Sequence, residues 1–250
     1  MAYRIITDPV TGTQWQFKPA AKEFRADAEH AAALLGRLWG FQTPESSITS
    51  DAGQYGQVQR LVDAIGDLEY GQEVGWYDVA PIPWSSLSAE QVSDIACEHV
   101  LDWALDNDDS RASNYLRTAD GRIVGIDKGR AFVSFGHWEG LAADKRADER
   151  SAQVSTSLYA AIRSHAIERS TADIAYRAVM ARATRMSATP DSKVAYIVGS
   201  GTSSRPSFGL PGNQADLIAA VLARKATLAA DFSALWARVY AEAGWTLPAV

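Results

Sequence analysis

A hairpin-like stretch in the middle of the chain, NYLRTADGRIVGID, places the strongest constraint on the fold. Two runs rich in β-branched and aromatic residues flank Asp120 and Gly121, and an Asp-Gly pair in that setting indicates a two-residue hairpin turn. In that register Asn114 lies directly opposite Asp127. A three-residue loop would shift the register by one position and make these two residues diagonal neighbours.

The side chains at the ends of this hairpin are of the kind that bind a hard divalent cation. A carboxylate and an amide oxygen at cross-strand distance form half of a shell suited to Mg²⁺. Asp109 lies five residues before Asn114, in the loop that leaves a predicted helix, and this loop would bring its carboxylate to the same place. The alternative is that Asp106, Asp108 and Asp109 only end the helix and face water. The facing pair of Asn114 and Asp127 makes this alternative weaker.

The composition and charge of the chain restrict the class of protein. With 250 residues, the chain suffices for one large domain or two small lobes, and 47% hydrophobic with 22% charged residues is ordinary for a globular protein. The net charge of −6 argues against general binding to nucleic acid or to an anionic membrane. Local groups must therefore hold any anionic ligand.

Cysteine usage and the N-terminal sequence bear on the compartment. The single cysteine, Cys97, excludes an intrachain disulfide and a cysteine-based zinc site, and its apolar helical context indicates a core residue. The first residues lack the basic and apolar regions of a signal peptide. No apolar run approaches the roughly 20 residues that span a bilayer. The expectation is a cytoplasmic protein without membrane insertion.

The order of predicted elements is mixed at first and helical later. Strands in YRIIT and TQWQFKP flank the turn DPVTG, a helix follows over 21–39, and TPESSIT and GQYGQVQRLVD indicate further strands. Ser88 and Gln91 form a capping box that begins a helix ending at Leu105. Further helices are expected over 151–168, 171–186 and 214–243. The sequence thus predicts an α+β fold with a strand-and-helix lobe over 1–65, a connector over 66–86 and a mainly helical lobe over 87–250.

The spacing of the polar residues resembles a known superfamily. Asp109, Asn114, Asp127 and Gly129 follow one another as in the catalytic and metal-binding core of protein-kinase-like proteins. The segment GRIVGIDKGRAF resembles the corresponding motif of the branch that contains HipA-like and phosphoinositide-3/4-kinase-like enzymes. It also resembles that of small actinobacterial and phage kinase-like domains. Weaker similarity to the same superfamily extends over most of the chain. The resemblance implies a two-lobed protein-kinase-like fold with a reduced N-terminal lobe.

The same resemblance implies a role for each polar residue. Asp109 would accept the proton of an attacking hydroxyl or orient it. Asn114 and Asp127 would hold Mg²⁺ ions that bridge the phosphates of ATP. Phosphoryl transfer depends mainly on positioning and on neutralising charge, so few groups are needed.

A lysine that contacts the phosphates is expected upstream, and Lys18 at the end of a predicted strand is the candidate. Its alternative is an exposed lysine, the commonest fate of this residue type. Glu29 follows on the next helix among alanines and would form the ion pair of kinase folds with Lys18. Glu23 and Asp27 are rivals for that pair.

The apolar segment QRLV, Gln59 to Val62, is the expected hinge between the lobes. Backbone groups of Gln59 and Leu61 would meet an adenine ring there. An apolar strand at a lobe boundary is equally consistent with a plain core strand.

Two features depart from the protein-kinase pattern. Only one hairpin fits before Lys18, and its turn DPVTGT carries one glycine, so a glycine-rich phosphate loop is reduced or absent. Asn107 and Asp108 stand where protein kinases have His-Arg before the catalytic Asp. The HipA and phosphoinositide branch tolerates such changes.

The predicted function is an ATP- and Mg²⁺-dependent kinase that acts on a hydroxyl of a protein or peptide. A lipid acceptor is less expected, because no basic or amphipathic membrane surface is visible. The alternatives are a kinase-like module that binds nucleotide or a partner without catalysis, and a transferase of AMP from ATP. A metal-dependent nuclease is disfavoured by the acidic balance.

Other segments carry weaker signals. The run Gly199–Asn213 lacks the Gly-Lys-Ser/Thr ending of a P-loop and favours a flexible linker over the alternative of a substrate-contacting loop. His99 on the predicted helix indicates a core histidine. The stretch Lys128–Arg150, which includes His137, lies where a kinase has its activation or substrate loop, and its basic residues would contact an acceptor or face water.

Overall fold

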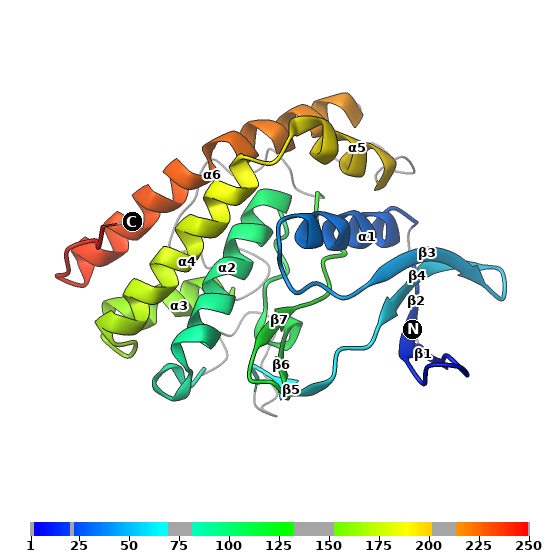
Figure 1. Ribbon diagram of the computed structural model, residues 1–250, viewed down its shortest axis with the longest axis horizontal. Helices are drawn as coiled ribbons and strands as arrows, with labels where there is room; N and C mark the ends of the chain where they lie inside the picture. Colours follow the sequence, from blue (N-terminus) through cyan, green and yellow to red (C-terminus); the bar gives the residue numbers. More distant parts are fainter. Residues whose placement is uncertain (1–2, 21–22, 70–81, 133–152, 202–213, 250) are drawn as a thin grey trace.

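The computed structural model describes residues 3–20, 23–69, 82–132, 153–201 and 214–249 (Figure 1). Its α+β class and its mainly helical C-terminal part agree with the prediction. An antiparallel sheet packed against one helix occupies one side, and a bundle of helices with a small second sheet occupies the other. Within the described part of the chain, no helix is both long and apolar enough to cross a membrane.

The N-terminal sheet has four strands in the order β1-β2-β4-β3. All neighbours run antiparallel, and Lys18 on β2 lies opposite Gln57 on the central strand β4. Both hairpins match the predicted strands. The strand bounds are β1 Arg4–Thr7, β2 Gln14–Pro19, β3 Ser46–Asp51 and β4 Gln54–Arg60.

Helix α1, Glu23–Leu38, covers one face of this sheet. Phe24, Ala28, Ala31 and Leu35 are buried at the three- and four-residue steps that the sequence pattern predicted. The small alanines allow the helix to approach the strands closely. The helix ends at Leu38, and Gly40 follows with a φ of +82°, the left-handed conformation that glycine adopts readily after a helix.

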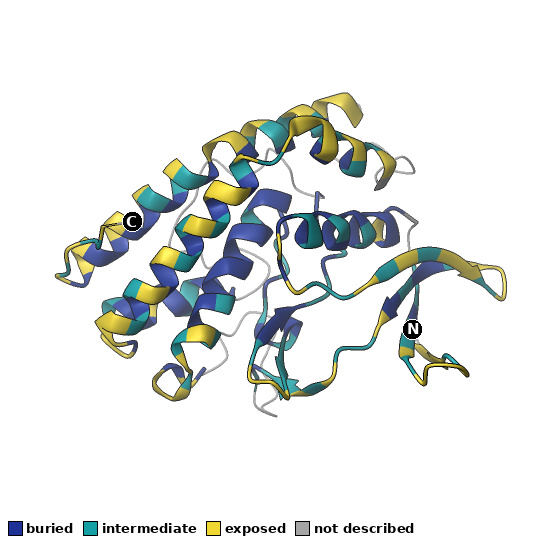
Figure 2. Cartoon of the chain, in the orientation of Figure 1, coloured by how far each residue is buried: buried dark blue, intermediate teal, exposed yellow. Residues whose placement is uncertain are grey.

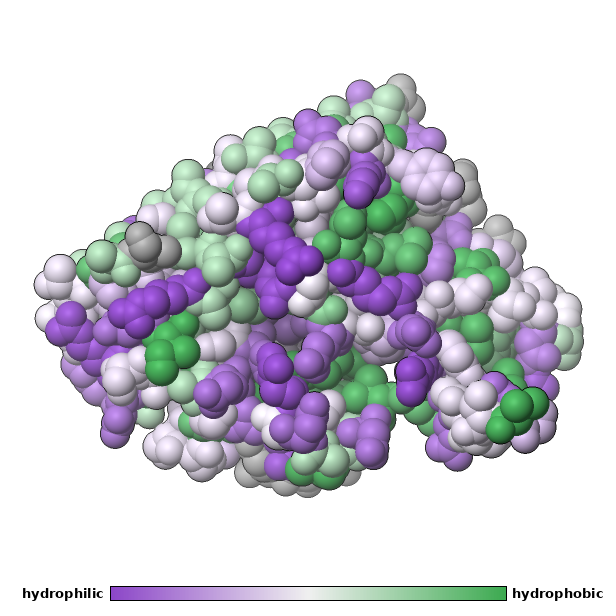
Figure 3. Space-filling view, in the orientation of Figure 1, coloured by the Kyte–Doolittle hydropathy of each residue, from purple (hydrophilic) through white to green (hydrophobic). Residues whose placement is uncertain are grey.

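The C-terminal end of α1 is attached to the helical part of the molecule. Arg182 donates to the Trp39 carbonyl over 2.7 Å, and its guanidinium lies 4.5 Å from the centre of the Phe41 ring. A cavity of about 590 Å³ adjoins these residues. In Figure 3 hydrophilic side chains gather across the middle of the face between the helices and the sheet.

A second sheet has the order β5-β6-β7, with β5 Ala64–Asp67, β6 Tyr115–Thr118 and β7 Ile123–Gly125. The hairpin itself was predicted, but the third strand was not. Strand β5 spans the predicted boundary between the first lobe, 1–65, and the connector, 66–86. Residues 70–81, most of that connector, lie outside the described residues. Pairing of β5 with β6 involves residues about fifty positions apart, which no local pattern reveals.

The register of the β6–β7 hairpin differs from the prediction, because Asn114 does not lie directly opposite Asp127. Tyr115 pairs with Gly125, and the Ile126 amide donates to the Asn114 carbonyl over 2.8 Å. The turn therefore has three residues and ends with Gly121 at a φ of +83°, as in hairpins closed by a glycine bulge. The two-residue turn was wrong, and the three-residue alternative holds.

Helix α2, Ala89–Leu105, is buried along most of its length at the centre of the helical part (Figure 2). Its capping box is present in full: the Ser88 hydroxyl accepts from the Gln91 amide, and the Gln91 side chain accepts from the Ser88 amide. His99 and Cys97 are buried, and His99 Nδ1 lies 2.8 Å from the Tyr159 hydroxyl. Both are core residues, as the sequence indicated.

Four further helices follow in the described part of the chain. The bounds are α3 Val154–Arg163, α4 Arg169–Ser187, α5 Asp191–Gly201 and α6 Gln214–Glu242. Of these, α3, α4 and α6 pack against α2. Helix α5 was not predicted, and it takes up the first three residues of the expected linker, whose remaining positions 202–213 lie outside the described residues. It packs against α1 and α6. Its glycines and valines are poor helix formers, so packing stabilises it.

Candidate active site

A cavity of about 430 Å³ lies between the N-terminal sheet, α1 and two loops of the helical part. Its lining comes from strands β2 and β4 with Tyr3 beside them, from the first turns of α1, from the loop after α2 and from the loop after β7. These segments bring together most of the residues singled out in the sequence. The polar lining residues are Lys18, Arg25, Glu29, Gln57, Asp109, Arg111, Asp127 and Arg130.

Lys18 and Glu29 form an ion pair at the inner wall of the cavity. Lys18 Nζ lies 2.8 Å from Glu29 Oε1, and the two side chains are 15% and 10% exposed. With its amide nitrogen facing the carboxylate, Gln57 donates to Glu29 Oε2 over 2.9 Å. The rival Asp27 accepts a hydrogen bond from the Tyr55 hydroxyl instead, and the side chain of Glu23 lies outside the described residues.

Burial acts in opposite directions on the two partners. Burial opposes the charged form of Lys18, but Glu29 and Asp127 outweigh this and hold its pKa above the ordinary value. Burial also raises the pKa of Glu29, and Lys18 only partly offsets the increase. The pair keeps a cation at a position from which it can act on a ligand in the cavity.

Asp127 faces the same cavity from the loop after β7. Its side chain is 40% exposed, and its Oδ1 lies 4.0 Å from Lys18 Nζ. Its φ of +55° is in the left-handed region, which costs a non-glycine residue roughly 1–2 kcal/mol. Strained backbone of this kind is concentrated at functional sites, where the surrounding structure holds a side chain in place.

The loop after β7 lies against α1 at Gly129, where a Cβ would be in ordinary van der Waals contact. A Cβ at this position would lie 3.7 Å from Glu29 Oε2 and 3.8 Å from both the Arg25 carbonyl and Asp127 Oδ1. The loop after β7 is thus in close contact with the first turns of α1. The Asp-x-Gly run of the sequence corresponds to this contact.

Asn114 lies behind Asp109 rather than in the wall of the cavity. It is 5% exposed, and its Nδ2 donates to the Asp109 backbone carbonyl over 2.7 Å, which leaves its amide oxygen to accept or coordinate. Within the described ranges, no three His, Cys, Asp or Glu side chains converge as a metal shell. Asp127 and Asn114 fit Mg²⁺ as one carboxylate and one amide oxygen, because Mg²⁺ takes its other ligands from phosphate and water.

Asp109 lines the cavity from the loop after α2. Its Oδ1 lies 3.3 Å from Arg111 Nε, and its side chain is 14% exposed. Burial raises the pKa of Asp109, and Arg111 only partly counters this. A carboxylate with a raised pKa is a better proton acceptor, which is the property a general base needs.

The loop that carries Asp109 is held by a buried carboxylate that the sequence analysis did not single out. Asp102 on α2 is 2% exposed, and its two oxygens accept four hydrogen bonds. One oxygen accepts from Asn107 at 2.8 Å and from Lys128 at 2.7 Å, and the other accepts from Ser110 at 2.7 Å and from Tyr115 at 3.2 Å. Asp102 therefore connects the loops that carry Asp109 and Asp127.

Lys128 corrects the prediction of an acceptor-contacting or water-facing basic stretch. It is 5% exposed, and its Nζ also lies 3.0 Å from Glu98 Oε2. A buried lysine between two carboxylates fixes the residue next to Asp127 to α2. The remainder of that stretch, 133–152 with His137, lies outside the described residues.

The neighbouring aspartates also have fixed partners. Asp108 forms a two-point ion pair with Arg130, with distances of 2.5 and 2.6 Å. Asp106 ends α2 in the left-handed conformation, and its Oδ1 accepts from Arg224 on α6 over 3.0 Å. Asp106 thus serves the end of α2, whereas Asp108 joins the loop after α2 to the loop after β7.

The predicted hinge residues lie away from this cavity. Gln59 is buried within β4 between Gln16 and Ser46 of the neighbouring strands. The Leu61 amide donates to the Gln14 carbonyl, and Leu61 lines a different cavity of about 490 Å³. Adenine contact by Gln59 and Leu61 stays a prediction.

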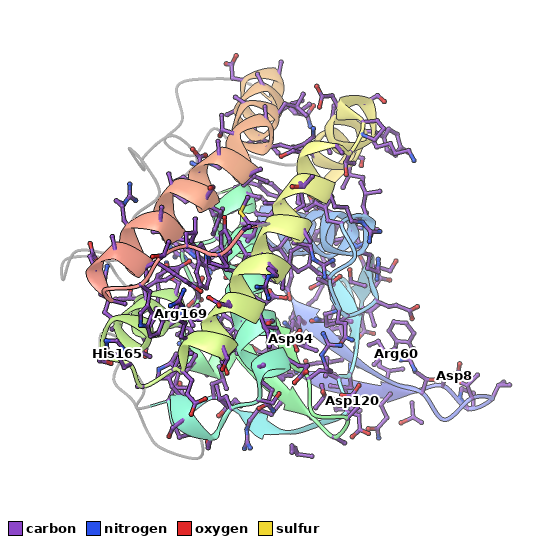
Figure 4. The ribbon with its side chains drawn as sticks, turned by 60° about the vertical axis from the view of Figure 1, so that its left-hand side comes forward. Asp8, Arg60, Asp94, Asp120, His165 and Arg169 are labelled. Carbon is purple, nitrogen blue, oxygen red and sulfur yellow. The ribbon has the colours of Figure 1, made fainter. Side chains whose placement is uncertain are left out.

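The turn of the β1–β2 hairpin is closed by its own aspartate. Asp8 Oδ1 accepts from the amides of Val10 and Thr11, and its other oxygen accepts from the Thr11 hydroxyl. Figure 4 shows Asp8 at the tip of this hairpin, at the end of the molecule remote from the helices. The turn therefore offers no amide cradle to the cavity.

Comparison with known proteins gives a fold but no sequence relative. No protein-family profile matches the chain, and no curated protein matches it in sequence. The chain is similar to the Helicobacter pylori proinflammatory kinase CtkA, with a TM-score of 0.54 and 9% identity over 95% of this chain and 94% of that one. It also matches a chain of the Shewanella oneidensis HipA, HipB and operator DNA complex, with a TM-score of 0.49 and 14% identity over 90% of this chain and 60% of that one.

The first of these matches shows that the chain has a protein-kinase-like fold. The predicted kinase-like architecture is thereby confirmed. At this level of identity the match speaks for the fold alone, and the chemistry must be argued from the residues of this chain.

Proposed function

We propose that this chain, which has a protein-kinase-like fold, is an ATP- and Mg²⁺-dependent phosphotransferase. One observation carries the proposal: a single cavity gathers the Lys18–Glu29 pair, Asp109 and Asp127 from four separate segments. A cation, a half-buried carboxylate with a raised pKa and a second carboxylate open to the cavity are the groups that phosphoryl transfer requires.

Each residue would have a distinct role. Lys18 would contact phosphate oxygens, and Glu29 would hold its ammonium group in place. Asp127 and the Asn114 amide oxygen would hold Mg²⁺, which when bound would neutralise phosphate charge. Asp109 would accept the proton of the attacking hydroxyl, and the Asp102 hydrogen bonds would keep its loop in position.

A protein or peptide hydroxyl is the acceptor that we favour. The net charge of −6 disfavours attraction to an anionic lipid surface or to nucleic acid. Asp109 lies at a cavity wall that also bears Arg111 and Arg130, so an acceptor would approach between charged side chains.

The test is Mg²⁺-dependent ATP turnover and autophosphorylation by the wild type and by Asp109→Ala and Asp127→Ala. Each variant should lose at least about a hundredfold in rate, as expected when a group that acts on the transition state is removed. ATP labelled at the γ- or the α-phosphate separates transfer of a phosphoryl group from transfer of AMP. Full activity in both variants would refute the assignment.

A second candidate is a kinase-like module that binds nucleotide without transfer. The observation that favours it is the β1–β2 turn, whose amides are engaged by Asp8 instead of a ligand. Calorimetry that detects ATP binding, together with no labelled product from any acceptor, would select this candidate over the enzyme.

A further inference from the structure

Four cationic side chains line the cavity, and three of them are already paired. Lys18 pairs with Glu29, Arg111 with Asp109, and Arg130 with Asp108. The fourth is Arg25, which is exposed, and among the described residues no carboxylate forms an ion pair with it. Arg25 is therefore the cation best placed to neutralise a new negative charge in the cavity.

The position of Arg25 follows from the geometry of α1. It is the third residue of the helix and lies four residues before Glu29, so both side chains belong to the same helical face, one turn apart. Its carbonyl faces Gly129 in the loop that carries Asp127. The guanidinium thus extends this face from the Lys18–Glu29 pair toward the N-terminal end of α1, where the helix dipole also favours an anion.

The β1–β2 turn does not compete for this role. The β1–β2 turn lies at the remote end of its hairpin, and its amides are satisfied by Asp8. A phosphate chain bound between Lys18 and Asp127 would meet side-chain donors, not amides of that turn. Arginine suits this task, because its planar guanidinium can bind two phosphate oxygens at once.

We propose that Arg25 is a phosphate-binding residue that, together with Lys18, grips the terminal phosphates of the nucleotide in place of a glycine-rich loop. The inference rests on the proposed function, since it takes the cavity to be a nucleotide site. It implies that Arg25, in the first turn of α1, makes the affinity for a nucleotide depend on how many phosphates the nucleotide carries.

The test measures the dissociation constants of ATP, ADP and AMP by calorimetry with Mg²⁺ for the wild type and three variants. Arg25→Gln should weaken ATP binding by about ten- to a hundredfold, the value of one or two charge-assisted hydrogen bonds. AMP binding should change by less than about twofold, because AMP lacks the terminal phosphates. Arg25→Lys should recover part of the loss, since it keeps the charge but not the two-point geometry.

The matched control is Arg177→Gln, another exposed arginine on a helix, which lies in α4 and does not line the cavity. It should leave all three constants unchanged. Wild-type binding of ATP with an unaltered constant in Arg25→Gln would overturn this inference alone. A wild type that binds no ATP would overturn the proposed function together with it. Melting curves of all variants should coincide, because the side chain is exposed.

Discussion

Two lysines lie near the strained backbone at Asp127, and each has two carboxylate neighbours. Lys18 lies 2.8 Å from Glu29 and 4.0 Å from Asp127, and Lys128 lies 2.7 Å from Asp102 and 3.0 Å from Glu98. The chemistry is the same in both groups. The access to solvent is not: Asp127 is 40% exposed, whereas both partners of Lys128 are below 5%.

This difference assigns different tasks to the two groups. The Lys128 group is closed, so its charges can serve only to hold α2, β6 and two loops together. The Lys18 group opens into the cavity, so part of its charge can act on a ligand. Similar ion pairs in one molecule can therefore be structural or functional according to what surrounds them.

The largest expected effect follows from removing the closed cation. Lys128→Met would leave Asp102 and Glu98 buried without a counter-charge, and breaking a buried pair in this way costs about 3–5 kcal/mol. This is a large part of the total stability of a typical domain. Urea unfolding measures the loss. Lys193→Met, at an exposed position of α5, is the control and should unfold at the wild-type midpoint. A wild-type midpoint in Lys128→Met would contradict the structural role.

Removing the open cation should separate stability from activity. Lys18→Met should reduce the rate of ATP turnover by about a hundredfold. Its urea midpoint should fall by less than half of the Lys128→Met change, because Glu29 has a raised pKa and can take up a proton when its partner is gone. Turnover and unfolding are measured on the same samples. Equal losses of stability in the two variants would remove the distinction between the groups.

Measuring the free energy of unfolding as a function of pH tests the role of the Asp102 carboxylate in the Lys128 group. Burial alone would raise the pKa of Asp102, but Lys128 and the hydrogen bonds from Asn107 and Ser110 hold it below the ordinary value. A lowered pKa contributes stability that is fully present above the unfolded pKa of about 4 and is lost as the pH falls through the folded value. Asp102→Asn should therefore cost about 2 kcal/mol at neutral pH, and its gap from the wild type should close below pH about 4.

Glu98→Gln is the matched comparison for that measurement. Burial raises the pKa of Glu98, so its charged form weakens the fold above the folded pKa, and acid relieves this penalty. The variant should be less destabilised than Asp102→Asn at neutral pH, and its gap should not close on acidification. Parallel pH profiles for the two variants would contradict the opposite pKa directions.

The smallest effect is expected at Asp8, the carboxylate of the β1–β2 turn. Hydrogen bonds from the Val10 and Thr11 groups lower the pKa of Asp8. Asp8→Asn should lower the melting temperature slightly and leave the dissociation constant of ATP within about twofold of the wild type, because the turn lies away from the cavity. A marked loss of ATP affinity would show that the turn acts at the site after all.

Local chemistry was sufficient to predict much of the fold. The capping box of Ser88 and Gln91, the alanine-rich face of α1 and the β-branched runs of the hairpins each encode their structure within a few residues. The polar spacing from Asp109 to Asp127 likewise identified the two carboxylates that now share a cavity, because each lies within a few residues of the end of α2 or β7.

Contacts between distant segments were decided only by the tertiary structure. In the sequence, Asp102 is an ordinary helix aspartate and Lys128 an ordinary loop lysine. No neighbouring residue in the sequence indicates that the two are buried together. The three-residue turn, the β5–β6 pairing and α5 also depend on packing energies that sum over the whole fold. The sequence by itself determined which charged groups exist and on which elements. The tertiary structure decided which of them open into a cavity and which are sealed, because solvent access depends on how all the elements pack.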